Sequence, residues 1–164
     1  MSASPDRPSN RRYAAALVFI VVGSLAGWQL ESYLMVTTTP SLKHRLYFRE
    51  KAAPKVIKRG DYICFERVDP KIDGGKRFSA TKIAKCVAGE QLRVDGQSYY
   101  CGEEYLGMAR RVSSSGEKLP HFIFNGPIPT GKVFAFGDHP DSYDSRYWGF
   151  VGVEELTDRV HPIW

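Results

Sequence analysis

One uninterrupted apolar stretch lies near the N-terminus, whereas the rest of the chain alternates short apolar runs with polar ones. The stretch reads YAAALVFIVVGSLAGWQL, from Tyr13 to Leu30, and Glu31 is the first charged residue after it. It is just long enough to cross a hydrocarbon core of about 30 Å, and the half-apolar continuation through Val36 extends it. The pattern predicts a transmembrane helix over residues 13–36, preceded by a short tail over residues 1–12.

A cleaved secretory signal is the alternative interpretation of this stretch. SLAG, at Ser24–Gly27, offers small residues where a signal peptide is cut. The half-apolar residues that follow favour a retained anchor. Arginines precede the stretch, but a larger basic cluster between Lys43 and Arg59 follows it, so charge alone leaves the orientation open.

The remaining residues, 37–164, are typical of one mainly β, antiparallel domain. Asp95-Gly96 separates two strand-like runs and is a strong hairpin signal. Breaker residues predict loops at Asp69–Gly75, Ser113–Pro120 and Gly126–Gly131. Strands are expected in DYICFERV (Asp61–Val68), TKIAKCVAG (Thr81–Gly89), EQLRV and QSYYC on either side of Asp95-Gly96, and GKVFAFGD (Gly131–Asp138).

Charge and cysteine content narrow the classes of partner and site. The net charge of +5 requires an anionic partner to be considered, and the cluster between Lys43 and Arg59 is typical of a solvated face near a membrane. No zinc-finger, RNP-like or helix-turn-helix pattern is present, so no nucleic-acid partner is expected. The cysteines, Cys64, Cys86 and Cys101, lack CxxC spacing, which argues against a metal site and is compatible with one disulfide and one free thiol.

Two catalytic arrangements compete in the polar segments. GDHPDSYDSRYWGF (Gly137–Phe150) holds His139 among serines and aspartates, but neighbouring residues in an extended loop point in different directions, so crowding does not make a triad. A serine with a lysine base instead needs a lysine whose pKa burial has lowered. Lys85 has apolar neighbours in IAKCVAG, whereas Lys82 is expected to project from the opposite face of the strand. Ser41, shortly after the anchor, is the candidate nucleophile.

The order of these segments resembles the type I signal peptidase family of Ser–Lys membrane proteases, and most closely its TraF-type conjugative branch. The motifs that carry the resemblance are TPSLKHRLY (Thr39–Tyr47), RGDYICF (Arg59–Phe65), KCVAGE (Lys85–Glu90) and, most specifically, IPTGKVFAFGDHPDSYDSRYWGFV (Ile128–Val151). Lys43 and Arg45 replace the Pro and Gly that usually follow the nucleophile. Gly89-Glu90 stands where a Leu-Pro-Gly-Asp turn usually follows the lysine box.

The resemblance implies a role for individual residues. Ser41 falls at the nucleophile position and Lys85 at the general-base position. Thr39 falls where a hydroxyl assists the oxyanion hole, and Ser142 where a serine orients the lysine amine. Asp144 and Arg146 fall where an ion pair braces the active-site loop, which also contains Asp138. No metal or cofactor is implied.

The resemblance also implies a setting and a substrate. It predicts an antiparallel coiled β-sheet domain of signal-peptidase/LexA-like type behind one transmembrane helix, with the tail cytoplasmic and the domain in the periplasm of a bacterial inner membrane. That oxidising compartment allows a Cys86–Cys101 disulfide across the hairpin region. The substrate would be an exported precursor with small residues before the cut, such as a pilin. The further partners implied for this protein are the lipids of the inner membrane and other conjugation proteins. A housekeeping signal peptidase, a self-cleaving LexA-type regulator and a non-enzymatic membrane-anchored assembly factor stay open.

Overall fold

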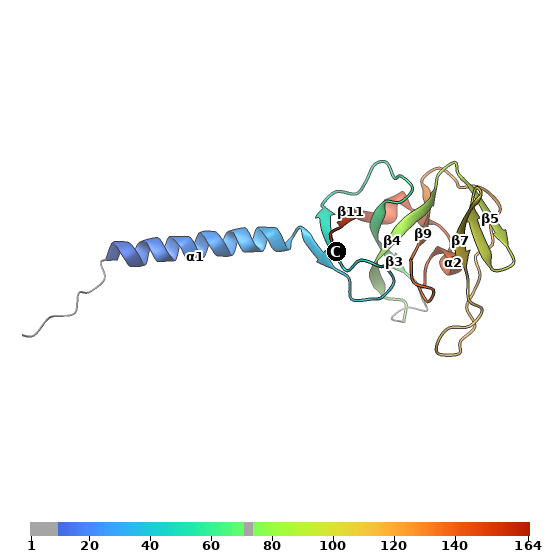
Figure 1. The fold of residues 1–164 in the computed structure, drawn as a ribbon, viewed down its shortest axis with the longest axis horizontal. Coiled ribbons are helices and arrows are strands. Elements are labelled where there is room, and N and C mark those ends of the chain that lie inside the picture. The colour runs from blue at the N-terminus through green and yellow to red at the C-terminus, as the bar shows by residue number, and fades with distance from the viewer. Residues whose placement is uncertain (1–9, 71–73) are drawn as a thin grey trace, which may run out of the picture.

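A long helix and a β domain make up the structure, a computed structural model that describes residues 10–70 and 74–164. The helix extends away from the β domain (Figure 1). In chain order the elements are α1 (Asn10–Glu31), β1 (Leu34–Val36), β2 (Leu46–Glu50), β3 (Tyr62–Val68), β4 (Arg77–Val87), β5 (Gln91–Asp95), β6 (Ser98–Cys101), β7 (Glu104–Met108), β8 (Gly126–Pro127), β9 (Lys132–Phe136), α2 (Ser145–Trp148), β10 (Val151–Gly152), the 3-10 helix η1 (Val153–Glu155) and β11 (Leu156–Pro162).

Helix α1 carries the apolar N-terminal stretch. Its segment Arg12–Glu31 is the one helix, among the described residues, that is long and apolar enough to cross a membrane. Its apolar side chains lie exposed rather than packed on the domain, which suits a segment surrounded by lipid. The helix ends at Glu31, earlier than the expected span, because residues 34–36 pair with β2 as strand β1 and Tyr33 stacks on Phe48. Most of the expected tail, residues 1–9, lies outside the described residues.

Two antiparallel sheets form the domain. The larger has the strand order β1-β2-β11-β3-β4-β9-β10, and the smaller has the order β7-β6-β5-β8. The smaller sheet lies at the end of the domain away from α1 (Figure 1). Two hydrophobic cores, with buried residues such as Phe65, Phe134 and Tyr99, stabilise the sheets. Burial of each of these aromatic side chains contributes roughly 1.5–3 kcal/mol to the free energy of folding. The mainly β, antiparallel architecture predicted from the sequence is confirmed.

The strands expected from sequence all form, and the Asp95-Gly96 turn closes the β5–β6 hairpin with Asp95 opposite Ser98. Six strands were not expected, because they are short or carry polar residues and gain their order from pairing: β1, β2, β7, β8, β10 and β11. The loop predicted at Gly126–Gly131 contains the short strand β8, which pairs with β5. Of the loop expected at Asp69–Gly75, residues 71–73 lie outside the described residues.

Candidate active site

A cavity of about 510 Å³ lies between the segment after the anchor and the first half of β4. Ser41 lines it from the loop that follows β1, and Lys82 lines it from β4. The lining residues are Met35, Val36, Thr37, Thr38, Thr39, Ser41, Leu42, Arg49, Phe78, Ser79, Ala80, Thr81 and Lys82. The cavity therefore joins the candidate nucleophile to a lysine across a distance of some forty positions in the chain.

Lys82 is the buried amine of this site. Its side chain is 4% exposed, and its Nζ donates a hydrogen bond of 2.7 Å to Ser142 Oγ. Burial lowers the pKa of Lys82 to about 8, although the nearby Asp144 carboxylate opposes that change and Arg146 adds to it. A lysine with such a pKa is neutral in roughly a tenth of the molecules at pH 7, against fewer than one in a thousand for an ordinary lysine, and the neutral form is what a general base requires.

Lys85, the lysine expected from the sequence to be the general base, does not line the cavity. It is partly exposed and lies at the β-bulge of β4, where the register with β9 shifts between Ala84 and Cys86. Its apolar neighbours pack into the core themselves and do not enclose its amine. Lys82 is buried instead because Ser142, distant in sequence, packs on it.

A signal for Lys82 was present in the sequence. With Lys85 at the general-base position, the chain is too short for the Leu-Pro-Gly-Asp turn of the family, and Gly89-Glu90 stands in its place. If Gly89-Glu90 is instead matched to the Gly-Asp of that turn, every position moves by three residues and Lys82 takes the place given to Lys85. Gly89 has a φ of 86°, as a tight turn at this position requires.

The loop from Gly137 to Ser142 holds the Ser41 segment. The His139 backbone N–H donates to the Ser41 carbonyl at 3.2 Å, and the Asp138 carboxylate accepts from the Lys43 backbone N–H at 3.4 Å. Gly137 permits this approach, because a Cβ there would lie 2.1 Å from Ser142 Oγ and 2.7 Å from the Ser41 carbonyl oxygen. One loop thus positions both Ser41 and the partner of Lys82.

Asp144 and Arg146 form a buried ion pair under this loop. Arg146 Nε and Nη2 donate to the two Asp144 oxygens at 2.8 and 2.7 Å. Asp144 also caps α2 and accepts from the Gly137 backbone N–H, whereas Arg146 donates to the carbonyls of Ser142 and Met108. Because every charged group here has partners, the pair can fix the loop without leaving an unpaired buried charge.

Thr39 and His139 were also singled out from the sequence, and their side chains make no hydrogen bond to Ser41 or Lys82 among the described residues. Thr39 lines the cavity and is exposed. His139 is exposed and its Nδ1 accepts from the Asp141 backbone N–H, so only its own backbone reaches the Ser41 segment. Within the described residues, no hydrogen bond joins the Ser41 hydroxyl to Lys82; such contacts are often loose before substrate binds.

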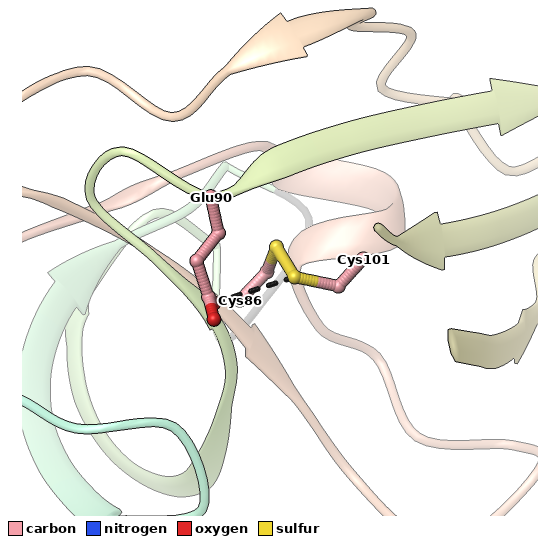
Figure 2. Close-up of side chains that lie close together, drawn as sticks. All are labelled: Cys86, Glu90 and Cys101. Atoms are coloured by element: carbon pink, nitrogen blue, oxygen red, sulfur yellow. Dashed lines mark hydrogen bonds between the residues drawn. A yellow bond between two sulfur atoms is a disulfide. The ribbon is translucent and has the colours of Figure 1, made fainter. Parts of the chain in front are cut away.

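A disulfide joins Cys86 at the end of β4 to Cys101 at the end of β6, with Cα atoms 5.7 Å apart (Figure 2). It links the large sheet to the small one. The Glu90 carboxylate lies 3.3 Å from Cys101 Sγ. These three side chains resemble a metal-ligand group, but two sulfurs bonded to each other supply no thiolate, so only one carboxylate remains.

Comparison with known proteins places these observations in context. A model of the family described as signal peptidase, peptidase S26, matches residues 11–164. Signal peptidase I of Buchnera aphidicola subsp. Schizaphis graminum is 50% identical over 38 residues, which are 23% of this chain and 12% of that protein. Signal peptidase I of Haemophilus influenzae is 45% identical over 38 residues, 23% of this chain and 11% of that protein. A solved signal peptidase I from Enterococcus faecalis V583 is 27% identical, with a TM-score of 0.38, over 62% of this chain and 94% of that one.

Proposed function

Because the chain belongs to the signal peptidase family, peptidase S26, a family of serine peptidases, we propose that it is a membrane-bound endopeptidase that removes signal or leader segments from exported precursors. Ser41 is the nucleophile and Lys82 the general base. One observation carries the assignment: the buried Lys82 amine, held by Ser142 at 2.7 Å, opens on the cavity that Ser41 also lines.

The proposed reaction needs only groups of this chain and water. Neutral Lys82 takes the proton of the Ser41 hydroxyl, whose oxygen attacks the scissile carbonyl. The backbone N–H of Ser41 and the Thr39 hydroxyl stabilise the oxyanion. Protonated Lys82 then gives its proton to the leaving amine, which breaks the peptide bond and leaves an acyl-Ser41 ester. Lys82 next activates a water molecule, which hydrolyses the ester and restores Ser41.

The sheet offers a way to hold an extended substrate beside these groups. β1 is the edge strand of the large sheet, and β9 pairs with β4 only from Ile83 onward. In the part of the chain that the structure describes, β1 and the first half of β4 therefore both present an unpaired edge to the cavity. Backbone hydrogen bonds to such edges bind extended peptides, with side chains alternating into pockets. The substrate is an extended precursor segment with small residues before the cut.

A narrower assignment rests on the resemblance of the Ile128–Val151 segment to the TraF-type branch. On that basis the substrate is a pilin or another conjugation protein, and the enzyme serves a specialised rather than a housekeeping role. Cleavage of a candidate pilin precursor, compared with cleavage of a general secretory precursor, tests the distinction. Equal rates for the two would favour the housekeeping alternative.

The membrane setting is part of the proposal. Residues 13–36 would contain the retained anchor, residues 1–12 a cytoplasmic tail and residues 37–164 the periplasmic domain. Beyond β1, the surface carries the cations Lys43 and Arg45 next to Trp164, which is 83% exposed although its backbone is hydrogen-bonded to Leu46. Exposed aromatic and basic groups are typical of a surface that meets lipid head groups.

The nucleophile is tested with the full chain in detergent micelles and a synthetic precursor that has Ala at the first and third positions before the cut. Ser41→Ala is expected to abolish cleavage measured by mass spectrometry, because no other group supplies the attacking oxygen. Ser79→Ala is the matched control, since Ser79 lines the same cavity, and it should keep most of the activity. A folded Ser41→Ala protein that cleaves at the normal rate would refute the assignment.

The orienting role of Ser142 is tested by the pH dependence of kcat/KM. For the unsubstituted protein the rate should rise with pH along a limb near pH 8, since Lys82 must lose its proton to act. Ser142→Ala removes the acceptor of the Lys82 amine, so it should lower kcat and move this limb. An unchanged pH profile in Ser142→Ala would show that Ser142 does not orient the base.

A further inference from the structure

Arg49 is a second cation in the cavity, and the proposed reaction does not use it. It is the next-to-last residue of β2, where its backbone N–H donates to the Tyr33 carbonyl at 2.7 Å. Its side chain lines the same cavity as Ser41 and Lys82. Because Tyr33 precedes β1 whereas Ser41 follows it, Arg49 lies by the end of the cavity away from the nucleophile.

The guanidinium of Arg49 is incompletely partnered. Its Nε is inaccessible to solvent and has no hydrogen-bond partner. The nearest carboxylate oxygen, Asp158 Oδ2, lies 3.8 Å from Nε, which is beyond hydrogen-bonding distance although close enough for attraction. The side chain as a whole is 36% exposed, so the donors on Nη1 and Nη2 are open to solvent, and in the part of the chain that the structure describes no hydrogen bond occupies them. A carboxylate can bind these donors in place of water.

The charge of the cavity indicates which group that is. Its ionisable lining residues are Arg49 and Lys82, and no carboxylate lines it. The other polar lining groups are hydroxyls, such as those of Thr81 and Ser79. An anionic side chain of an extended substrate would meet no negative charge on the walls, and a planar carboxylate matches the fork of donors on arginine.

We propose that Arg49 is a specificity-determining residue that binds an Asp or Glu side chain of the precursor, a few residues from the bond that is cut. This proposal rests on the proposed function, since it assumes that the cavity holds the substrate. Asp158 attracts the guanidinium from its Nε side, and the substrate carboxylate accepts hydrogen bonds from the exposed Nη groups. Recognition at this position acts on binding and therefore on KM more than on kcat.

The test uses synthetic precursor peptides in which Asp, Asn or Lys is placed in turn at each position on both sides of the cut. The full chain in micelles should cleave one Asp peptide about tenfold faster, as kcat/KM, than its Lys counterpart, with most of the difference in KM. Arg49→Gln should make the Asp and Asn peptides equal, and Arg49→Lys should keep part of the preference. Arg49→Glu should reverse it and favour the Lys peptide, a gain that misfolding cannot produce.

Arg45→Glu is the matched control, because it makes the same change of charge at an exposed residue that does not line this cavity. It should leave the Asp preference intact. Three results would overturn the proposal: no position at which Asp is preferred to Lys, a preference that survives Arg49→Gln, or an equal loss in Arg45→Glu. Failure of the unsubstituted protein to cleave any peptide would instead count against the proposed function, and binding of the same Asp and Lys peptides to Ser41→Ala would still decide the role of Arg49.

Discussion

The two halves of β4 differ although they form one continuous strand. The first half, Arg77–Lys82, pairs with β3 on one edge, and its other edge opens on the cavity; it carries the buried Lys82. The second half, Ile83–Val87, pairs with β9, while only Ile83 of it still pairs with β3; it carries Lys85 and the disulfide-bonded Cys86. In the first half, the edge without a partner strand is free to bind a substrate at the cavity. In the second half, the same edge is occupied by β9.

The difference shows that apolar neighbours in sequence do not identify a buried lysine. Lys85 has the more apolar neighbours but stays partly exposed, since those neighbours occupy the core themselves. Lys82 is enclosed by residues brought from far along the chain, such as Ser142. Four predictions separate the two halves.

The largest effect is expected from the lysines themselves. Lys82→Ala should lower kcat about 10³-fold, because the general base is lost. Lys85→Ala should change it less than about threefold, since its side chain does not line the cavity. Cleavage of a synthetic precursor checks both, with circular dichroism to confirm folding. A large loss in Lys85→Ala with a small one in Lys82→Ala would show that Lys85 is the general base.

Gly137→Ala tests the loop that closes the first half of β4 over the site. The added methyl would collide with Ser142 Oγ and with the Ser41 carbonyl, so the two segments must separate. A displacement of about 1 Å at reacting groups costs about 10²-fold in rate, and we expect a loss of that size in kcat. Gly27→Ala is the control, because a methyl there meets nothing within 4 Å. Normal kinetics in Gly137→Ala would mean that the close approach is not needed.

The disulfide tests the second half. Replacing Cys86 and Cys101 together by Ser removes a link between residues 15 positions apart, which should cost about 3 kcal/mol of unfolding free energy. Activity well below the melting temperature should stay within a few fold, because the cysteines do not line the cavity. Urea denaturation and peptide cleavage measure the two effects. A folded variant without activity would show that the second half also shapes the site.

The smallest effect concerns stability and pH. The pKa of Lys82 falls from 10.5 to about 8 on folding, so between these pH values the unfolded chain binds more protons and stability rises with pH. Lys82→Met removes this penalty and the bond to Ser142, and we expect a net gain of about 2 kcal/mol at pH 7 that shrinks by pH 10. Urea denaturation at both pH values, with Lys85→Met as control, measures it. A gain independent of pH would contradict the lowered pKa.

Several features of the molecule followed from the sequence alone. The apolar stretch from Tyr13 predicts a helix because its length and composition are local properties. The Asp95-Gly96 turn closes its hairpin because those two residues favour the required backbone angles. The segment from Ile128 to Val151 identifies the family because its residues are specific as a string, and the family model covers it.

The tertiary structure decided which lysine is buried at the cavity that Ser41 lines. Alternation along a strand predicts that Lys82 and Lys85 point to opposite faces of the sheet. Which of the two faces is buried depends on the segments that pack against it. That neighbour is the loop of Ser142, which also holds the Ser41 backbone through His139 N–H. The strands β1 and β11 likewise form through pairing with distant residues, and no local pattern encodes them. Burial and pairing are properties of the whole fold, and they set the pKa of Lys82 and the open edge of β4.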